Sequence, residues 1–495
     1  MNLMEKGRTM TKEKNKNELG KKSIFFIIFT IIVCTILQIA LNFNHNAWCD
    51  EIFSIDTVKE NFGNMWNILV NDVHPPLYYI ILKLITCIFN YNFFAFKMVS
   101  LLPIILNVIF ISYITIKEKR INNKNVILLI LYIIMTTLTS NFLWLGTELR
   151  MYSWAMLFVT ISGVFAYKLY NKFSKANFMF FILSSLAAAL THYWALIMEC
   201  VIYMFLFVFL ILKNRKNVKK VIITVMVTIL GYIWWLPIAI KQLLTVKNDY
   251  WILFSFSDVK IFLSKIIGNE INVYISLIII IGIVILAIYK YRKSSDVKIK
   301  QDIIFGILTV SIPFIIIIIG VLFNVLMRQI FIERYFIPCL GLFWLGIFTL
   351  LNYIDARKAL TVIFTIILIY LVIVGYRNKW IEEYDKGAED TVNTIIPMLK
   401  EDDILTSNYV HFTLNVLDFY FPNRKDNILK IEDINFETEN RTIFYFEDNS
   451  NVIDKNNIIK NGYNIQKVYE GNIDIQQWNG LILDRYNFSV YKIEK

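Results

Sequence analysis

Charged residues are scarce in this sequence of 495 residues. They make up 18% of the chain, against about 25% in an ordinary soluble domain. Hydrophobic residues make up 57%. They occur in long uncharged runs rather than in alternation with polar residues, which excludes a water-soluble core as their explanation. The composition therefore predicts a polytopic α-helical membrane protein.

Cysteine is also rare and shows no pattern. The five cysteines form no Cys-x-x-Cys motif, so neither a disulfide framework nor a zinc site is predicted. The C-terminal part contains no glycine-rich phosphate loop, no serine-centred nucleophile elbow and no cluster with metal-ligand spacing. The apolar run that begins at Ser23 has no small-residue cleavage site, so we expect a retained anchor rather than a signal peptide.

About 11 segments are apolar over the length of a membrane-spanning helix, roughly 20 residues. The long stretch 176–212 is interrupted near His192, so it is interpreted as two helices joined by a tight turn. The shorter apolar segment 77–90 carries Lys83, and we expect it to lie along the membrane surface; the alternative is one half of a hairpin with the next span. The predicted spans are 23–43, 98–116, 125–147, 151–167, two within 176–212, 221–240, 271–289, 303–327, 335–354 and 359–376.

The distribution of basic residues predicts the orientation. With the N-terminal segment 1–22 in the cytoplasm, the segments between spans that face inward hold 26 lysine and arginine residues, and those that face outward hold 10. Cytoplasmic loops carry such an excess of positive charge in membrane proteins. The basic balance thus reports topology, and no nucleic-acid partner is predicted. We expect a multi-pass protein of the cell membrane with a cytoplasmic N-terminus.

The three predicted parts are the basic N-terminus 1–22, the membrane domain 23–376 and the tail 377–495. The tail holds 14 basic and 21 acidic residues, and the odd number of spans places it outside the cytoplasm. Helix-like and strand-like stretches alternate along it, which predicts a small extracytoplasmic α/β domain. The helix-like stretches are Thr391–Lys400 and Phe412–Tyr420, and the strand-like ones are Asp403–Ser407, Thr442–Phe446, Leu481–Leu483 and Ser489–Ile493.

The first outer loop, 44–79, carries the most chemistry. Asp50 and Glu51 follow the first span directly, in an apolar setting, where a carboxylate can act as a general base. Adjacent residues do not share a helix face, so one carboxylate would act and the other would orient it or bind a partner. The alternative is an interfacial pair that only ends a helix. His74 is followed by two prolines, which hold it before the next helix; a plain helix-start signal is the alternative.

Arginine and tyrosine recur together at the outward ends of two spans. Arg150 is followed by Tyr152, and Arg334 by Tyr335. Arginine binds phosphate in a bidentate manner, so these pairs, with His74 and His192, are candidates for an anion site at the membrane surface. Arginines that anchor a span end in the headgroup region are the alternative. All four histidines of the chain, including His45 and His411, fall on the outward side.

The order of these motifs resembles that of the GT-C membrane glycosyltransferases of the protein O-mannosyltransferase and aminoarabinose transferase type, glycosyltransferase family 39 and relatives. The similar features are an Asp-Glu pair opening the first outer loop, HPPLYY at the next apolar segment, Arg-Met-Tyr after the third span, Thr-His-Tyr between the fifth and sixth, and Glu-Arg-Tyr-Phe-Ile-Pro opening a late span. The resemblance covers the membrane domain.

The resemblance implies transfer of a sugar from a polyprenyl-phosphate donor to a protein, glycolipid or cell-wall glycan on the outer face. Asp50 matches the position of the catalytic carboxylate. Donor phosphate and substrate would be bound by His74, Arg150, Tyr152, His192, Arg334 and Tyr335. Related aminoarabinose transferases carry lysine where this chain has His74, so a phosphate contact there requires an N–H donor. No metal site is predicted, although a divalent cation near the first outer loop is compatible with the resemblance.

Two other functions fit the number of spans. A transporter or a flippase for lipid-linked sugars would need ionisable groups or broken helices near the centre of the membrane. A sensor or scaffold would use the tail as its binding domain. The sequence favours the transferase, because its candidate residues gather at one membrane surface.

Overall fold

Most of the chain is helical in the computed structural model. Contacts divide it into two compact units: Met1–Phe43 with Glu60–Trp380, and Asn44–Lys59 with Ile381–Lys495. The second unit therefore joins part of the first predicted outer loop to the C-terminal region. The structure describes residues 2–44, 46–118, 123–213, 218–246, 254–268, 270–327, 329–355, 357–408, 416–448, 455–472 and 487–495.

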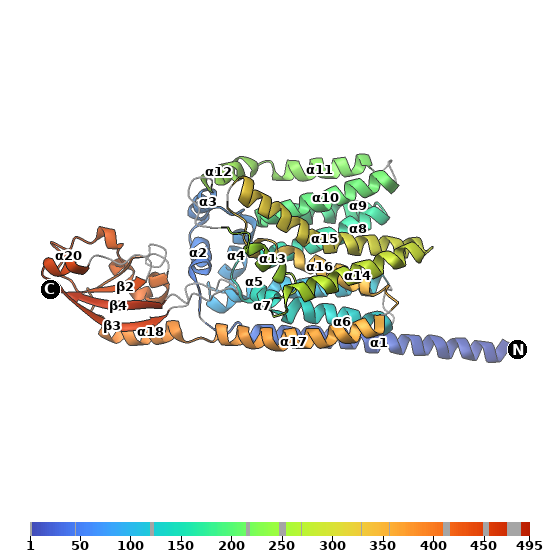
Figure 1. Cartoon of the computed structure of the whole chain (residues 1–495), viewed down its shortest axis with the longest axis horizontal. Coiled ribbons are helices and arrows are strands. Elements are labelled where there is room, and N and C mark those ends of the chain that lie inside the picture. Colours follow the sequence, from blue (N-terminus) through green and yellow to red (C-terminus); the bar gives the residue numbers. More distant parts are fainter. Residues whose placement is uncertain are drawn as a thin grey trace. The chain divides into compact units, whose positions relative to one another are not determined.

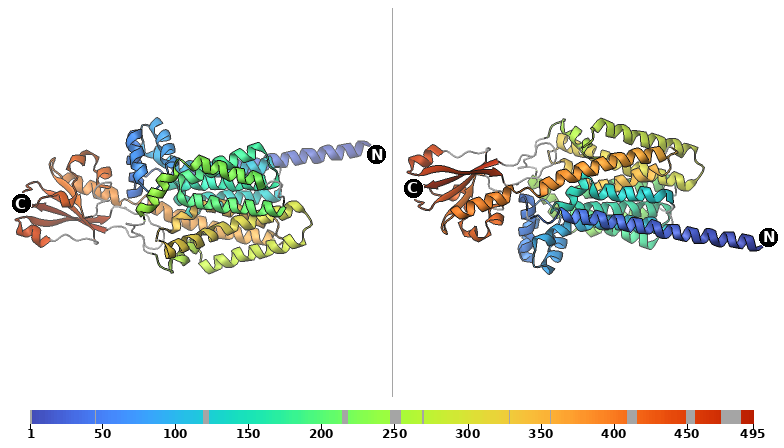
Figure 2. Two further views of the ribbon diagram at one scale, coloured as in Figure 1. Left: turned by 90° about the horizontal axis from the view of Figure 1, so that it is seen from above. Right: turned by 90° about the horizontal axis from the view of Figure 1, so that it is seen from below.

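The first unit is a bundle of apolar helices that stand side by side (Figure 1). Two further views show the same helices from above and below (Figure 2). The helices and 3₁₀ turns are α1 Asn2–Ala40, α3 Phe62–Asn71, α4 Leu77–Ile88, α5 Phe93–Lys117, α6 Asn123–Leu138, α7 Ser140–Thr147, α8 Tyr152–Asn171, α9 Lys175–Thr191, α10 Tyr193–Lys213, α11 Val218–Tyr232, α12 Leu236–Val246, α13 Asp258–Ser264, α14 Val273–Lys293, α15 Val297–Leu326, η2 Glu333–Tyr335, η3 Ile337–Cys339, α16 Leu340–Leu351 and α17 Arg357–Glu383.

Small residues let neighbouring helices of the bundle approach closely. A Cβ atom added to Gly346 in α16 would lie 2.1 Å from the Thr309 hydroxyl and 2.9 Å from the Gly306 carbonyl oxygen, both in α15. Close contact through small residues is the usual way in which membrane helices pack, since lipid tails are as apolar as the side chains they replace. Polar contacts add to this packing: the Tyr376 hydroxyl of α17 donates to the Leu37 carbonyl of α1 at 3.0 Å.

Among the described residues, seven helices are long and apolar enough to cross a membrane, or nine if two bent pairs each count as one span. The chain is thus a multi-pass membrane protein, and the number eleven stays a prediction. One bent pair, α6 with α7, turns by 55° at Thr139, whose backbone is extended. The other, α11 with α12, turns by 70° just before Pro237, a residue that is favoured in the first turn of a new helix.

The segment around Lys83 forms the short helix α4. Twelve residues of α-helix extend about 18 Å, less than the roughly 30 Å of the hydrocarbon core, so α4 is too short to cross it alone; its position along the membrane surface stays a prediction. Lys83 is buried: its ammonium donates to the Glu60 carbonyl and lies 5.0 Å from the Phe62 ring centroid. The Glu60 carbonyl therefore satisfies the ammonium of Lys83 inside the protein.

The C-terminal part of the second unit is built on a four-stranded mixed sheet in the order β1-β2-β4-β3. Ile443 of β2 faces Ile404 of parallel β1 and Ile493 of antiparallel β4, and all three are buried in one core.

Three of the four predicted strands are confirmed, and they correspond to β1, β2 and β4. The strand β3 was not predicted. The predicted strand Leu481–Leu483 lies outside the described residues, as do His45 and His411. The elements are α2 Cys49–Lys59, α18 Gly387–Ile395, η4 Ile396–Met398, β1 Ile404–Ser407, α19 Asp418–Tyr420, η6 Pro422–Asn427, η7 Ile431–Asp433, β2 Ile443–Asp448, α20 Lys455–Lys460, β3 Asn464–Asn472 and β4 Asn487–Glu494.

Candidate functional site

Six predicted substrate-binding residues lie at helix ends of the first unit. His74 precedes α4, and Arg150 lies in the four-residue link, residues 148–151, between α7 and α8. The turn predicted near His192 is confirmed: this single extended residue separates α9 from α10. Arg334 and Tyr335 form η2. Because α9 runs back antiparallel to α8, and α10 starts where α9 ends, these helix ends meet at one end of the bundle.

His74 connects Arg150 to Asp72. The Nη2 atom of Arg150 lies 3.3 Å from Nε2 of His74, and Nδ1 of the same ring lies 2.9 Å from a carboxylate oxygen of Asp72. A guanidinium can only donate, so this arrangement requires Nε2 to accept and Nδ1–H to donate. Burial by itself would raise the pKa of Asp72, but the hydrogen bond from His74 and the positive charge of Arg150 help to lower it. Asp72 is therefore ionised and ends the hydrogen-bonded series Arg150–His74–Asp72.

His192 lies between the rings of two predicted site residues. Its ring centroid is 5.3 Å from that of Tyr152 and 5.2 Å from that of Tyr335. Burial, reinforced by the positive charges of Arg150 and Arg334, lowers the pKa of His192 well below its ordinary value. The imidazole is thus neutral at physiological pH, and Nδ1 has no hydrogen-bond partner among the described residues. A neutral ring has one donor and one acceptor to offer a ligand.

Arg334 stacks against the same pair of tyrosines. Its guanidinium carbon lies 5.8 Å from the Tyr152 ring centroid and 5.9 Å from that of Tyr335. A cation at this distance from an aromatic face is attracted by the ring quadrupole, and more strongly where water is excluded. Arg150 and Arg334 are 3% and 5% exposed. Two arginines this deeply buried at a membrane-helix end are not simple anchors in the headgroup region.

A cavity of about 300 Å³ opens beside these groups. His74, His192 and Tyr335 contribute to its polar wall, and most of the remaining lining is apolar. Such a cavity combines groups suited to a charged or hydroxylated head with a surface suited to a hydrocarbon chain. The apolar and aromatic lining comes from Val73, Tyr193, Trp194, Leu196, Ile197, Tyr232, Leu236, Ala239, Ile240, Leu243, Phe323 and Ile330.

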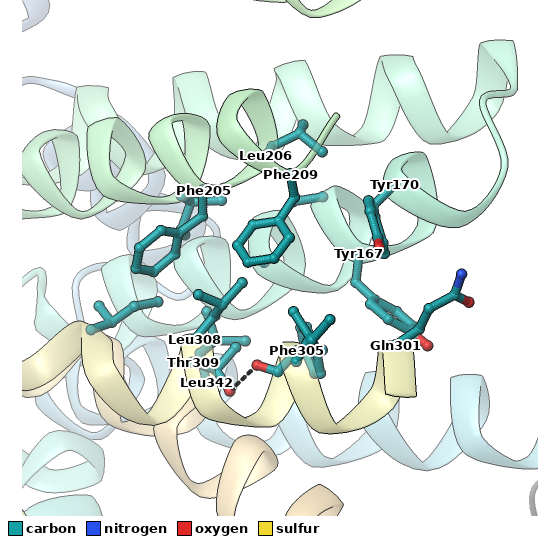
Figure 3. Close-up of a pocket in the computed structure, with 15 residues that line it drawn as sticks. Tyr167, Tyr170, Phe205, Leu206, Phe209, Gln301, Phe305, Leu308, Thr309 and Leu342 are labelled. Atoms are coloured by element: carbon teal, nitrogen blue, oxygen red, sulfur yellow. Dashed lines mark hydrogen bonds between the residues drawn. The ribbon is translucent and has the colours of Figure 1, made fainter. Parts of the chain in front are cut away.

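Another cavity, between α8, α10 and α15, has a different character (Figure 3). Phe205, Phe209 and Phe305 project into it, and no charged residue lines it. Its only side-chain hydrogen bond drawn in the figure runs from the Thr309 hydroxyl to the Phe305 carbonyl, 3.0 Å, and is internal to α15. It contains none of the predicted site residues, and no carboxylate, histidine, lysine or arginine lines it, so it is not the candidate site.

Asp50 and Glu51 lie in α2 of the second unit and differ in environment. Glu51 is 3% exposed, and its carboxylate accepts the backbone N–H of Trp48 at 3.2 Å. Trp48 is the N-cap residue, since its carbonyl accepts the first helical hydrogen bond from Ile52. Glu51 therefore forms the glutamate half of a capping box, which fixes the start of α2; a catalytic part for Glu51 stays a prediction. Asp50 is only partly buried, and its carbonyl accepts from the Ser54 hydroxyl at 2.9 Å.

Within the described ranges, no group of three or more histidine, cysteine, aspartate or glutamate side chains is arranged to hold a metal ion. Both ring nitrogens of His74 already face protein partners.

Sequence reasoning missed the residues that complete the cavity. Trp194 stacks on Tyr335 with ring centroids 6.2 Å apart, and Gln242 of α12 donates to the Leu69 carbonyl of α3 at 2.7 Å. Trp194 directly follows the Thr-His-Tyr motif in the sequence, and this position could have identified it as a candidate residue of the site. The contribution of α12 depends on the bend before Pro237, and no local pattern shows where a bent helix comes to lie.

No protein-family model and no curated protein matches the chain in sequence. Solved structures do match in fold. The crystal structure of ArnT from Cupriavidus metallidurans in the apo state aligns over 95% of this chain and 98% of ArnT, with a TM-score of 0.60 and 10% identity. The structure of the same protein bound to undecaprenyl phosphate aligns over 94% and 98%, with a TM-score of 0.57 and 11% identity. The chain therefore has the fold of ArnT, and the predicted GT-C architecture is confirmed.

Proposed function

We propose that this protein is a membrane glycosyltransferase that moves a sugar from a polyprenyl-phosphate donor to an acceptor on the extracytoplasmic face. The observation that carries the proposal is the convergence of four separate sequence motifs at one end of the bundle. His74, His192 and Tyr335 line one largely apolar cavity, and the buried Arg150 contacts His74. The ArnT fold and the undecaprenyl phosphate held by that protein support a lipid-linked donor. The acceptor would be a protein, a glycolipid or a cell-wall glycan.

The proposed reaction is a single inverting displacement. The acceptor oxygen attacks the anomeric carbon, the bond from that carbon to the phosphate oxygen breaks, and the acceptor proton passes to the Asp50 carboxylate. Inverting glycosidases need a second carboxyl group to protonate the leaving oxygen. Here the leaving group is a phosphate, whose negative charge Arg150 and Arg334 would stabilise. Asp50 is thus the proposed general base.

His74 and His192 would take different parts in binding the donor. His74 aligns Arg150 through its ring, because its two nitrogens connect the guanidinium to Asp72. His192 is neutral and lines the cavity, so it would offer a hydrogen bond to a sugar hydroxyl or a phosphate oxygen without adding charge. Tyr152 and Tyr335 would hold both His192 and Arg334 by ring contacts.

The test is a panel of radiolabelled polyprenyl-phosphate sugars supplied to membranes that contain the protein. The proposal expects one label to move to a membrane or cell-wall acceptor, and expects no transfer from the corresponding nucleotide sugars. Absence of transfer from every lipid-linked donor, with endogenous acceptor present, would contradict it.

A transporter or flippase is the second candidate, and one buried group favours it. Glu199 of α10 is 2% exposed within a predicted span; one of its carboxylate oxygens accepts from the Ser162 hydroxyl, and the other has no hydrogen-bond partner among the described residues. Buried carboxyl groups in membrane helices are frequent in ion and proton pathways. Solute or lipid movement across liposomes by the purified protein, without glycosylated product, would support this candidate.

A further inference from the structure

Residues of the C-terminal region hold the segment that leads into α2. The Asn44 side chain donates to the Glu383 carboxylate at 2.5 Å, and the Asn46 side chain donates to the Asp385 carbonyl at 2.8 Å. Asn44 and Glu383 are buried, at 7% and 5% exposed. A buried amide that donates to a carboxylate makes one of the stronger kinds of neutral-to-charged hydrogen bond. These contacts lie within the second unit and join chain segments more than 330 residues apart in sequence.

Tyr420 completes this attachment. Its hydroxyl accepts the Ala47 N–H at 3.2 Å and donates to the Ala47 carbonyl at 3.1 Å, so one side chain satisfies both backbone groups of one residue. The next residue, Phe421, is buried and packs against Phe446 of β2 with ring centroids 6.0 Å apart. The position of the Tyr420 hydroxyl is therefore set by the sheet.

Ala47 is the residue before the N-cap of α2. Trp48 follows it, and Glu51 caps Trp48 from within the helix. A helix that is fixed at its N-cap has its first turn fixed in position and direction, and Asp50 is the second residue of that turn. The path from the sheet to Asp50 thus runs through Tyr420, Ala47 and Trp48, with no flexible linker in between.

We propose that the C-terminal sheet domain positions Asp50 by clamping residues 44–47, with Tyr420 as the principal positioning residue. This inference rests on the proposed function of Asp50 as the general base. The domain would then be part of the catalytic apparatus rather than an independent binding module. A general base must lie within hydrogen-bond reach of the proton that it accepts, and a displacement of about 1 Å can lower a rate roughly 100-fold.

The first experiment compares two tyrosine-to-phenylalanine variants of the full-length protein. Tyr420→Phe removes the hydroxyl that holds Ala47. Tyr463→Phe is the matched control, because the Tyr463 hydroxyl also donates to a backbone carbonyl, that of Glu439, but inside the sheet domain and away from residues 44–47. Tyr420→Phe is expected to lower kcat roughly tenfold with the KM for the lipid-linked donor unchanged. Tyr463→Phe should keep the wild-type kcat. Equal losses in the two variants, or no loss in Tyr420→Phe, would overturn the proposal.

The second experiment is a rescue at the other end of the clamp. Asn44→Asp places a carboxylate against Glu383 and should lower kcat, since like charges repel in a buried site. Adding Glu383→Asn restores an amide facing a carboxylate with the two roles exchanged, and should recover most of the kcat. A double variant that is no better than Asn44→Asp alone would count against the clamp.

A third measurement needs no activity. Backbone amides at Cys49–Ile52 should exchange with deuterium faster in Tyr420→Phe than in Tyr463→Phe, because loss of the clamp loosens the first turn of α2. Equal exchange in the two variants would refute the clamp itself. If exchange differs but Asp50→Asn retains full activity, the clamp stands and the assignment of Asp50 as base fails instead.

Discussion

The guanidinium of Arg150 lies 3.3 Å from the imidazole of His74, and the far side of that ring meets the carboxylate of Asp72 at 2.9 Å. The His74 ring therefore restrains the guanidinium of Arg150 relative to Asp72. Preorganisation of this kind lowers the entropy cost of binding a ligand.

Arg150→Gln should weaken binding of the lipid-linked donor. Loss of hydrogen bonds to a charged phosphate costs about 1.5–3 kcal/mol, which corresponds to a rise in donor KM of roughly 10- to 150-fold. Arg150→Lys keeps the positive charge but loses the planar guanidinium fork. Its donor KM should therefore lie between those of the wild type and Arg150→Gln. KM for the donor and the thermal shift on adding undecaprenyl phosphate measure the effect. An unchanged donor KM in Arg150→Gln would exclude Arg150 from the phosphate site.

His74→Ala should act through Arg150. Removing the ring releases the guanidinium from its support, so donor KM should rise in the single variant. In an Arg150→Gln background, the same change should add little, because residues that work as one unit are not additive. The double-mutant cycle on donor KM gives the coupling directly. Independent, additive effects would show that His74 binds substrate by itself.

His192 should make the protein less stable in mild acid. Its pKa is lowered well below the ordinary value of 6.5 on folding, so between these two values the unfolded chain binds the extra proton and the folded chain does not. Stability therefore rises with pH through this window and is lost as the pH drops below 6.5, by up to about 1.4 kcal/mol for each pH unit. His192→Phe preserves a ring between the two tyrosines and removes the titrating group. The slope of Tm against pH over this range should be smaller in His192→Phe than in the wild type; identical slopes would contradict the neutral, buried state of His192.

Two glycines provide a test of helix packing. Gly346→Ala would place a methyl group 2.1 Å from the Thr309 hydroxyl and 2.9 Å from the Gly306 carbonyl oxygen, so α15 and α16 must move apart, at a cost of about 1–3 kcal/mol. Gly282→Ala in α14 meets nothing within 4 Å and should raise helix stability by about 0.5–1 kcal/mol. Thermal unfolding in detergent compares the two. If Gly346→Ala is as stable as Gly282→Ala, the close α15–α16 packing is not present.

The end of the bundle that holds the candidate site could be foreseen from the sequence for a physical reason. His74, Arg150, His192 and Arg334 each stand at the boundary of an apolar run, and the charge count assigned all four boundaries to one side. Successive helices in a bundle run in opposite directions, so every second boundary between helices lies at the same end of the bundle. Local sequence cannot report which side chains then meet, so the Arg150–His74–Asp72 chain and the wall from α12 appear only in the structure.

The least predictable feature is which part of the chain packs against the segment that carries Asp50. Hydropathy groups residues 44–59 with the membrane domain because they directly follow the first span. The structure groups them with the C-terminal region, through hydrogen bonds from Asn44, Asn46 and Ala47. Asparagine in a loop is usually interpreted as a solvated turn residue, so nothing local marks these two as long-range anchors. Similarly, β3 was missed because Gln466, Lys467 and Glu470 interrupt its apolar pattern.

The central claim is that Asp50 is the general base, and a neighbouring pair of isosteric variants tests it most directly. Asp50→Asn removes the basic oxygen, whereas Glu51→Gln keeps an oxygen that can still accept the Trp48 N–H in the capping box. Transfer of a radiolabelled sugar from its polyprenyl-phosphate donor should fall at least about 100-fold in Asp50→Asn and stay near the wild-type rate in Glu51→Gln, with both proteins inserted and folded. Wild-type transfer by Asp50→Asn would contradict the account.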